Sequence, residues 1–153
     1  MNIDRILTIC SKIVDSPAGG ALCLSKGGWE GWLQCELWRE INIEHRTPAE
    51  REVAYPAPNA ESRCDLVVEA AQNDRQIWIE IKVYSIYRAG EAAQFVDSVT
   101  ADLRKLDRAP PGVKTLLLVV VPRSIGGEVH RVLDVGGLNL NSFLTINTVL
   151  LWI

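Results

Sequence analysis

Residues 63–84 read RCDLVVEAAQNDRQIWIEIKVY, and this stretch decides the fold that we expect for the rest of the chain. It holds two apolar-rich runs, residues 65–70 and 77–84, separated by the polar residues 72–75. Two such runs joined by a short polar turn predict an antiparallel β-hairpin. We therefore expect this hairpin to lie at the centre of a sheet.

The second run of the hairpin carries charged side chains at alternate positions. Successive side chains of a strand point to opposite faces, so Glu80 and Lys82 share one face while the isoleucines between them share the other. Asp65 opens the partner strand and reaches the face of Glu80 and Lys82 if the register allows. The pattern thus predicts two carboxylates and a lysine on one face of the hairpin.

Two interpretations of this face are open. In the first, it is solvated, and Glu80 and Lys82 form a weak surface ion pair. In the second, it is a site for a hard divalent cation, which binds carboxylate oxygens and has a lysine beside its bound water. Spacing alone does not choose between them, because Glu-x-Lys is a common triplet.

Asp65, followed by Glu80-Ile81-Lys82 inside an apolar strand, resembles the D…(D/E)XK signature of the PD-(D/E)XK nuclease superfamily. Cys64 stands where the family name implies a proline. The resemblance implies an α/β fold of the restriction-endonuclease type, with a mixed central β-sheet in the element order αβββαβ, flanked by helices.

The same resemblance implies roles for the motif residues. Asp65, Glu80 and the backbone carbonyl of Ile81 would bind Mg²⁺ or Mn²⁺. Lys82 would orient or deprotonate the attacking water and offset the charge that grows on phosphorus.

The chain has 153 residues, of which 48% are hydrophobic, and a net charge of −3. This size fits one domain, residues 1–153, with a substantial core. Four cysteines at irregular spacings, without a CxxC pair, indicate free thiols in a reducing compartment rather than a zinc site. We find no signal peptide and no apolar run of transmembrane length, so we expect a cytoplasmic protein without membrane association.

The elements before the hairpin are predicted from apolar spacing. Residues 2–14 and 29–41 have the periodicity of helices, and the second of these places Glu36 amid tryptophans. A carboxylate there is paired, protonated or bound to a metal, unless it lies partly exposed at the edge of the tryptophan patch. In the superfamily that the chain resembles, the helix before the sheet often contributes one acidic residue to the site. The resemblance thus implies Glu36 as a further catalytic residue, with Glu40 as the fallback.

Further elements complete the expected core. Residues 50–55 are predicted to be the first strand and residues 89–107 a helix. Residues 115–121 (TLLLVVV) predict a strand buried on both faces, and its position after a helix indicates a parallel neighbour. The core then covers about residues 29–122. Residues 129–135 and 144–153 are predicted as additional strands outside it.

The acidic net charge does not favour an extensive nucleic-acid surface, but basic residues can cluster locally. Arg104, Lys105 and Arg108 lie together at the end of the helix predicted over residues 89–107. They are candidates for contacting nucleic acid. Alternatively, they only complement the dipole of their own helix.

The preferred hypothesis is a magnesium-dependent nuclease that hydrolyses phosphodiesters, with DNA as the expected substrate. The alternative is a non-catalytic protein-binding module on the same fold, such as an immunity protein or assembly factor, that grips a partner through an acidic, tryptophan-rich surface. Between the two lies a nuclease that works only as a homodimer or with a protein partner. The presence of Asp65, Glu80 and Lys82 together favours the nuclease.

Overall fold

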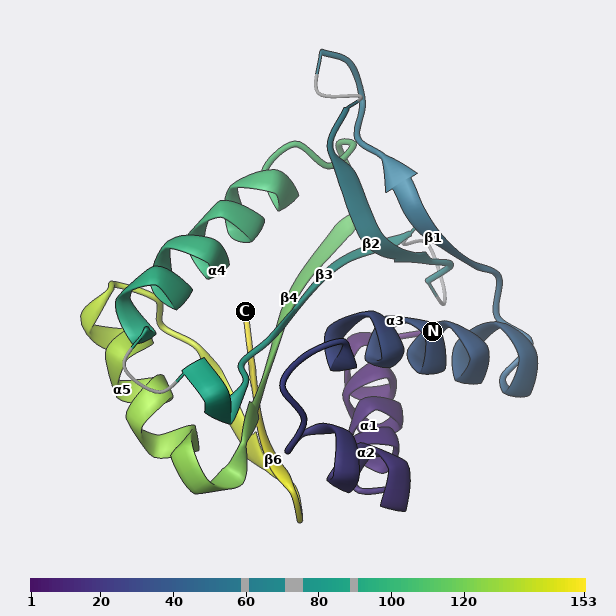
Figure 1. Cartoon of the computed structure of the whole chain (residues 1–153). Coiled ribbons are helices and arrows are strands. Elements are labelled where there is room, and N and C mark those ends of the chain that lie inside the picture. The colour runs from purple at the N-terminus through teal and green to yellow at the C-terminus, as the bar shows by residue number, and fades with distance from the viewer. Residues whose placement is uncertain (59–60, 71–75, 89–90) are drawn as a thin grey trace.

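The computed structural model describes residues 1–58, 61–70, 76–88 and 91–153. A mixed six-stranded sheet runs through the molecule, and helices flank it on both sides (Figure 1). Helices α1, α2 and α3 lie on one side of the sheet, and α4 and α5 lie on the other. The protein therefore has the α/β architecture that the sequence predicts.

The strands of the sheet lie in the order β1-β2-β3-β4-β6-β5. Strand β2 is antiparallel to both β1 and β3, strands β3 and β4 are parallel, and β6 is antiparallel to both β4 and β5. The hairpin and the parallel pair that the sequence predicts are both confirmed. The strands are β1 (Ala49–Ala54), β2 (Arg63–Val68), β3 (Ile77–Val83), β4 (Lys114–Pro122), β5 (Asn141–Leu144) and β6 (Thr148–Trp152).

Over residues 29–122 the α-helices and strands follow the expected order: α3, β1, β2, β3, α4, β4. No helix in the described ranges is long and apolar enough to cross a membrane. The α-helices are α1 (Ile3–Val14), α2 (Pro17–Leu22), α3 (Trp29–Arg39), α4 (Ala92–Leu106) and α5 (Gly126–Val135). Shorter turns of helix are Glu40–Glu44, Ile86–Arg88 and Arg123–Ile125.

The side chains of β3 divide between two cores. Ile77, Ile79 and Ile81 are buried in the core that α1 and α3 cover, whereas Trp78, and Tyr84 directly after the strand, belong to the core on the α4 side. Strand β4 is buried on both faces, as its uninterrupted apolar run predicts. The alternation along β3 therefore places Glu80 and Lys82 on the α4 side of the sheet.

Two predictions about secondary structure need correction. Residues 129–135 form part of helix α5 rather than a strand, and residues 144–153 contribute to two strands. Val129 and Leu133 on α5 are both buried in the core on the α4 side. Their separation of four residues is the spacing of side chains on one face of a helix. The turn predicted at residues 72–75 lies outside the described residues.

Hydrogen bonds connect the C-terminal end of helix α1 to the loop between β5 and β6. The carboxylate of Asp15 accepts hydrogen bonds from the backbone N–H groups of Ile146 and Asn147, at 3.1 and 3.0 Å. The side-chain amide of Asn147 donates back to the carbonyl of Val14, at 3.1 Å. The segment after residue 122, which has no place in the predicted core, is thus tied to the first helix.

Candidate functional site

Asp65 and Glu80 lie opposite one another on neighbouring strands. The β2–β3 register pairs Leu66 with Ile79, and continuing it by one residue places Asp65 opposite Glu80. The Oδ2 atom of Asp65 accepts a hydrogen bond of 2.7 Å from the backbone N–H of Ile81. Both backbone groups of a strand residue point toward the same neighbouring strand, so the Ile81 carbonyl also faces the Asp65 side. The structure therefore brings the expected ligand groups together.

Glu80 is fully buried, and described groups contact both of its carboxylate oxygens. The hydroxyl of Tyr55 donates to its Oε1 atom at 2.7 Å, and the ammonium of Lys105 lies 3.0 Å from its Oε2 atom. Tyr55 follows β1, whereas Lys105 comes from the last turn of α4. Burial of this carboxylate is thus compensated by one hydroxyl and one cation.

Lys82 joins α3 and α4 to the end of β3. Its ammonium lies 2.9 Å from Oδ2 of Asp102 on α4 and 3.6 Å from Oε1 of Glu30 on α3. The other oxygen of Glu30 accepts a hydrogen bond of 3.0 Å from the backbone N–H of Val83. Asp102 also pairs with Lys105, at 2.6 Å. We call Glu30, Asp65, Glu80, Lys82, Asp102 and Lys105 the acid–lysine cluster.

Carboxylates outnumber ammonium groups in the acid–lysine cluster, so it is net negative when fully ionised. Burial raises the pKa of Asp65 to about 6, although the hydrogen bond from Ile81 opposes the rise. Burial also raises the pKa of Glu80 to about 7, against the effect of the Tyr55 hydroxyl. Near neutral pH, each of these two carboxyl groups is therefore protonated in part of the molecules, and a proton there would compete with a bound cation.

Lys82 remains protonated at neutral pH. Burial lowers its pKa, but the hydrogen bond to Asp102 and the charges of Glu30, Asp102 and Asp65 outweigh that effect and raise the pKa above its ordinary value. Lys82 is therefore suited to donate hydrogen bonds and stabilise negative charge, rather than to accept a proton.

The Asp65–Glu80 pair fits the small divalent cation that the motif implies. Mg²⁺ is often held by one or two carboxylates, with water and substrate phosphate completing its ligands. One divalent cation would also balance the excess negative charge of the cluster. The described residues contain no group of three or more His, Cys, Asp or Glu side chains placed to hold a metal ion. A cation at this pair would have to replace Lys105 at Oε2 of Glu80.

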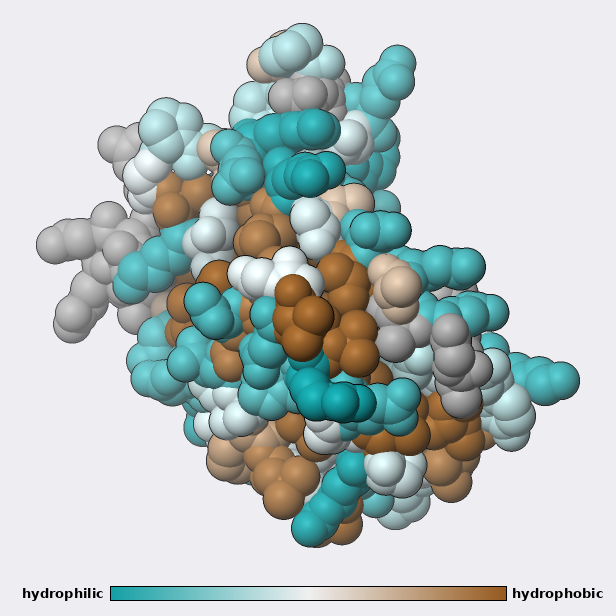
Figure 2. Space-filling view, turned by 90° about the vertical axis from the view of Figure 1, so that its left-hand side faces the viewer, coloured by the Kyte–Doolittle hydropathy of each residue, from teal (hydrophilic) through white to brown (hydrophobic). Residues whose placement is uncertain are grey.

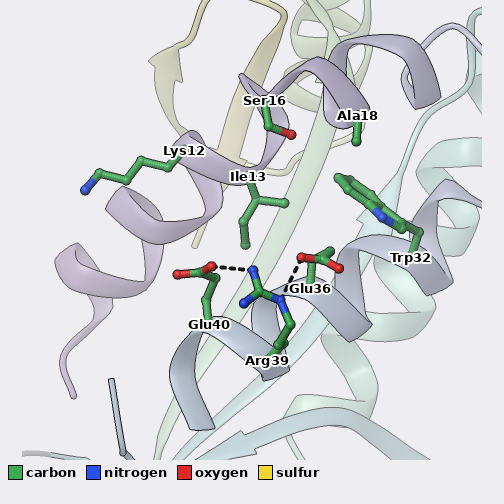
Figure 3. Close-up of a pocket in the computed structure, with 8 residues that line it drawn as sticks. All are labelled: Lys12, Ile13, Ser16, Ala18, Trp32, Glu36, Arg39 and Glu40. Atoms are coloured by element: carbon green, nitrogen blue, oxygen red, sulfur yellow. Dashed lines mark hydrogen bonds and ion pairs between the residues drawn. The ribbon is translucent and has the colours of Figure 1, made fainter. Parts of the chain in front are cut away.

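Glu36 lies apart from the cluster, contrary to the expectation for the helix before the sheet. It lines a different cavity of about 350 Å³, together with Trp32, Arg39 and Glu40 (Figure 3). Arg39 lies 3.1 Å from Glu36 and also pairs with Glu40, the fallback residue. Both carboxylates are therefore members of a partly exposed ion-pair network. On α3, Glu30 has the placement that was expected of Glu36.

The three basic candidates on α4 have different environments. Lys105 is half-buried in the acid–lysine cluster, whereas Arg104 and Arg108 are exposed. Viewed from the side of α4 and α5, the surface has hydrophobic residues in the middle of the face, between hydrophilic ones (Figure 2). Lys105 therefore pairs with carboxylates of the cluster, whereas Arg104 and Arg108 keep exposed positions toward the end of α4.

The sequence analysis does not name two members of the cluster, Asp102 and Glu30, and it expects Lys105 to contact nucleic acid rather than Glu80. Phe95, Val99, Asp102 and Leu106 recur at helical intervals, and all four side chains are buried. A carboxylate at a core position of an apolar stripe requires a partner. Asp102 itself was therefore the available signal, with Lys105 three residues further along the same face.

Cys64 occupies the position where the family name implies proline. Its thiol is buried and lies 3.3 Å from the carbonyl oxygen of Ile79, to which it can donate. Burial raises the pKa of this thiol to about 12, so it stays protonated at neutral pH. Cys64, like Cys10, Cys23 and Cys35, is free, as expected from the spacing of the cysteines.

No protein-family model matches the chain, and no curated protein or solved structure matches it either.

Proposed function

We propose that the protein is a metal-dependent nuclease of the PD-(D/E)XK type, acting on DNA. The observation that carries this proposal is the alignment of Asp65 and Glu80 across β2 and β3, with Lys82 beside them. The order α3, β1, β2, β3, α4, β4 around a mixed sheet supports it, because that order is the one expected of a restriction-endonuclease-like core.

Each motif residue has a distinct task in this proposal. Asp65, Glu80 and the carbonyl of Ile81 would hold Mg²⁺ or Mn²⁺, which would supply a polarised phosphodiester and a water of lowered pKa. Lys82 would place its charge against the phosphate oxygens that become more negative during hydrolysis. Asp102 and Glu30 hold the Lys82 ammonium in place from the helices on either side of the sheet.

Lys105 would balance the charge of Glu80 when no metal is bound. Its ammonium lies at Glu80 and also pairs with Asp102, so it can leave Glu80 while keeping a carboxylate partner. Since a metal would take its place at Glu80, binding the cation and releasing Lys105 would be a single exchange of one positive charge for another.

The same contact favours the second candidate, a non-catalytic protein-binding module on this fold. If Lys105 balances Glu80 permanently, the cluster is a structural ion-pair network and not a reaction centre. Titration calorimetry with Mg²⁺ and Mn²⁺ separates the two candidates. The nuclease requires binding by the wild type that Asp65→Asn abolishes, since the amide keeps the shape of the side chain and removes its charge.

The matching activity assay uses single-stranded DNA, double-stranded DNA and RNA, each with Mg²⁺ or Mn²⁺, and follows the products by gel. Metal-dependent cleavage that Asp65→Asn removes is the expected result. Absence of cleavage of every substrate, together with equal metal binding by wild type and Asp65→Asn, would leave the protein-binding module as the better description. A specific protein partner recovered by pull-down would then identify what it binds.

A further inference from the structure

A second polar cavity adjoins the acid–lysine cluster. It has a volume of about 240 Å³ and shares Lys82 and Glu30 with the cluster. Lys26, Gly27 and Gly28, which precede α3, also line it, and so does Ser98 of α4. We call it the Lys26 cavity. Its lining is contributed by the ends of α3 and β3 and by the middle of α4.

The cavity presents positive charge and hydrogen-bond donors. Lys26 and Lys82 both line it. Helix α3 begins here, and its N-cap residue Gly28 makes no side-chain cap. The first N–H groups of a helix have no partner within the helix, and they carry the positive end of its dipole. Anions are bound favourably at such a helix terminus.

Glu30, the one carboxylate among the described residues that line the cavity, does little to offset this positive charge. The two oxygens of Glu30 are engaged by the backbone N–H of Val83 and by the ammonium of Lys82. Lys26, by contrast, has no carboxylate within ion-pair distance among the described residues, and its ammonium lies 5.8 Å from the centre of the Tyr87 ring. Lys26 is therefore the cavity's uncompensated charge.

The backbone at the entrance leaves room for a ligand. Gly28 has a φ of +80°, in the left-handed region that favours glycine, and a Cβ atom built on Gly27 or Gly28 would meet nothing within 4 Å. Trp29, the first residue of α3, also lines the cavity. The site thus offers open space beside its two lysines.

We propose that the Lys26 cavity binds a backbone phosphate of a nucleic-acid strand and so positions the neighbouring phosphodiester at the acid–lysine cluster. This inference rests on the proposed nuclease function, because it assigns the cavity to the same substrate. Lys26 then serves as a phosphate-binding residue outside the reaction centre. Lys82, shared by the cavity and the cluster, lies between the bound phosphate and the phosphodiester that is cut.

The test measures binding of a fluorescent single-stranded DNA oligonucleotide by anisotropy, without divalent metal, at several salt concentrations. Lys26→Ala is expected to weaken binding about five- to tenfold and to reduce the slope of log K against log salt by about 0.7, the value for losing one phosphate contact on a single strand. Ser98→Asp, which adds a carboxylate to the cavity at a half-buried position, is expected to weaken binding in the same way.

Lys12→Ala is the matched control, because Lys12 of α1 lines a different cavity, with Trp32 and Glu36 of α3 (Figure 3). It should leave both the affinity and the salt slope unchanged. Equal effects of Lys26→Ala and Lys12→Ala, or no effect of either, would overturn the inference. Competition by inorganic phosphate as strong, per mole, as that of the unlabelled oligonucleotide would also overturn it, in favour of a free-anion site.

The inference and the proposed function fail in different ways. Cleavage of DNA that proceeds with the same KM in wild type and Lys26→Ala would leave the nuclease standing and remove the phosphate site. Oligonucleotide binding that depends on Lys26, without cleavage under any metal condition, would keep the phosphate site and remove the nuclease. A wild type that neither binds nor cuts the oligonucleotide would remove both.

Discussion

Lys82 is the residue whose removal separates catalysis from folding most cleanly. We expect Lys82→Ala to lower metal-dependent cleavage by about 100-fold or more, the usual loss when a positioned charge is removed from a reaction centre. Stability should change little, because Lys105 still pairs with Asp102 and because Ile79 and Ile81 supply the packing of β3. Cleavage kinetics and thermal denaturation of the same preparations measure the two effects.

The control for Lys82→Ala is Lys12→Ala, which removes a lysine from outside the cluster. It should cleave like the wild type. A Lys82→Ala variant that retains more than a tenth of the activity would show that Lys82 is not needed for the chemical step. A variant that melts many degrees lower would show that the ion pairs with Asp102 and Glu30 are structural instead.

The raised pKa values of Asp65 and Glu80 predict how stability depends on pH. Both values lie above those of the unfolded chain, so the folded protein binds more protons, and this contribution is complete below about pH 4. It is lost as the pH rises through about 6 to 7. We therefore expect the Tm to fall by about 5 °C or more between pH 5 and pH 8, in buffers without divalent metal.

Two additions make this pH measurement specific. Glu80→Gln should flatten the fall, because the amide does not titrate and can still accept the hydrogen bond from Tyr55. Mg²⁺ at pH 8 should raise the Tm of the wild type, since a ligand that binds only the folded state stabilises it. A Tm that rises from pH 5 to pH 8 in the wild type would contradict the assigned environments of these carboxylates.

How far the site can be predicted depends on what fixes each residue's position. Strand alternation places Glu80 and Lys82 on one face whatever the rest of the fold does, and the hairpin register then brings in Asp65. Lys105 is different, because its partner Glu80 belongs to a distant strand. A basic residue in the last turn of a helix has the same local pattern whether it faces solvent or a buried carboxylate.

At the scale of elements, α3 offers two glutamates that serve different purposes. Glu30, in the first turn, contacts both Lys82 and the backbone of Val83, whereas Glu36 pairs with Arg39 on the helix surface. We expect Glu30→Gln to reduce cleavage about tenfold or more, because Lys82 loses one of its two carboxylate partners. Glu36→Gln should leave cleavage unchanged and lower stability by no more than about 1 kcal/mol, as for a partly exposed ion pair.

The two glutamine variants are controls for each other, since both remove one charge from the same helix. Parallel measurements of cleavage rate and Tm decide the outcome. Equal activity of the two variants would show that Glu30 does not support the reaction centre. Lower activity in Glu36→Gln than in Glu30→Gln would restore the original expectation for the position of the acidic residue.

Elements were predictable where local pattern and tertiary packing agree. The β2–β3 hairpin and strand β4 show this agreement, because alternation or continuous apolarity has one natural outcome in a buried sheet. Helix α5 shows the opposite, since its valines favour a strand locally. Tertiary packing favours the helix instead, because Val129 and Leu133, four residues apart, are both buried in the core on the α4 side. The helix begins directly against β6, where a Cβ on Gly126 would lie 2.3 Å from Cγ2 of Val149.

At the scale of the whole molecule, Asp15 connects α1 to the loop between β5 and β6. We expect Asp15→Ala to destabilise the protein by about 1–3 kcal/mol, because two backbone N–H groups lose a charged acceptor. Chemical denaturation gives this difference directly. Asp134→Ala is the control, since the Asp134 carboxylate pairs among the described residues with His130 on its own helix, at 3.7 Å, and its removal should change stability by less than about 0.5 kcal/mol. A loss of stability in Asp15→Ala as small as that in Asp134→Ala would show that the contact between Asp15 and the loop does not stabilise the protein.

The order of the sheet also bears on how the chain is made in a cell. Strand β6 follows β5 in the chain but lies between β5 and β4, so β4 gains its second neighbour only after residue 148 has been translated. Until then, the nascent polypeptide exposes an edge of residues 115–121 that is apolar and uncharged, the kind of segment that aggregates readily. Translation speed and chaperone supply should therefore govern the yield, and a chain stopped before residue 148 should appear in the insoluble fraction of the lysate.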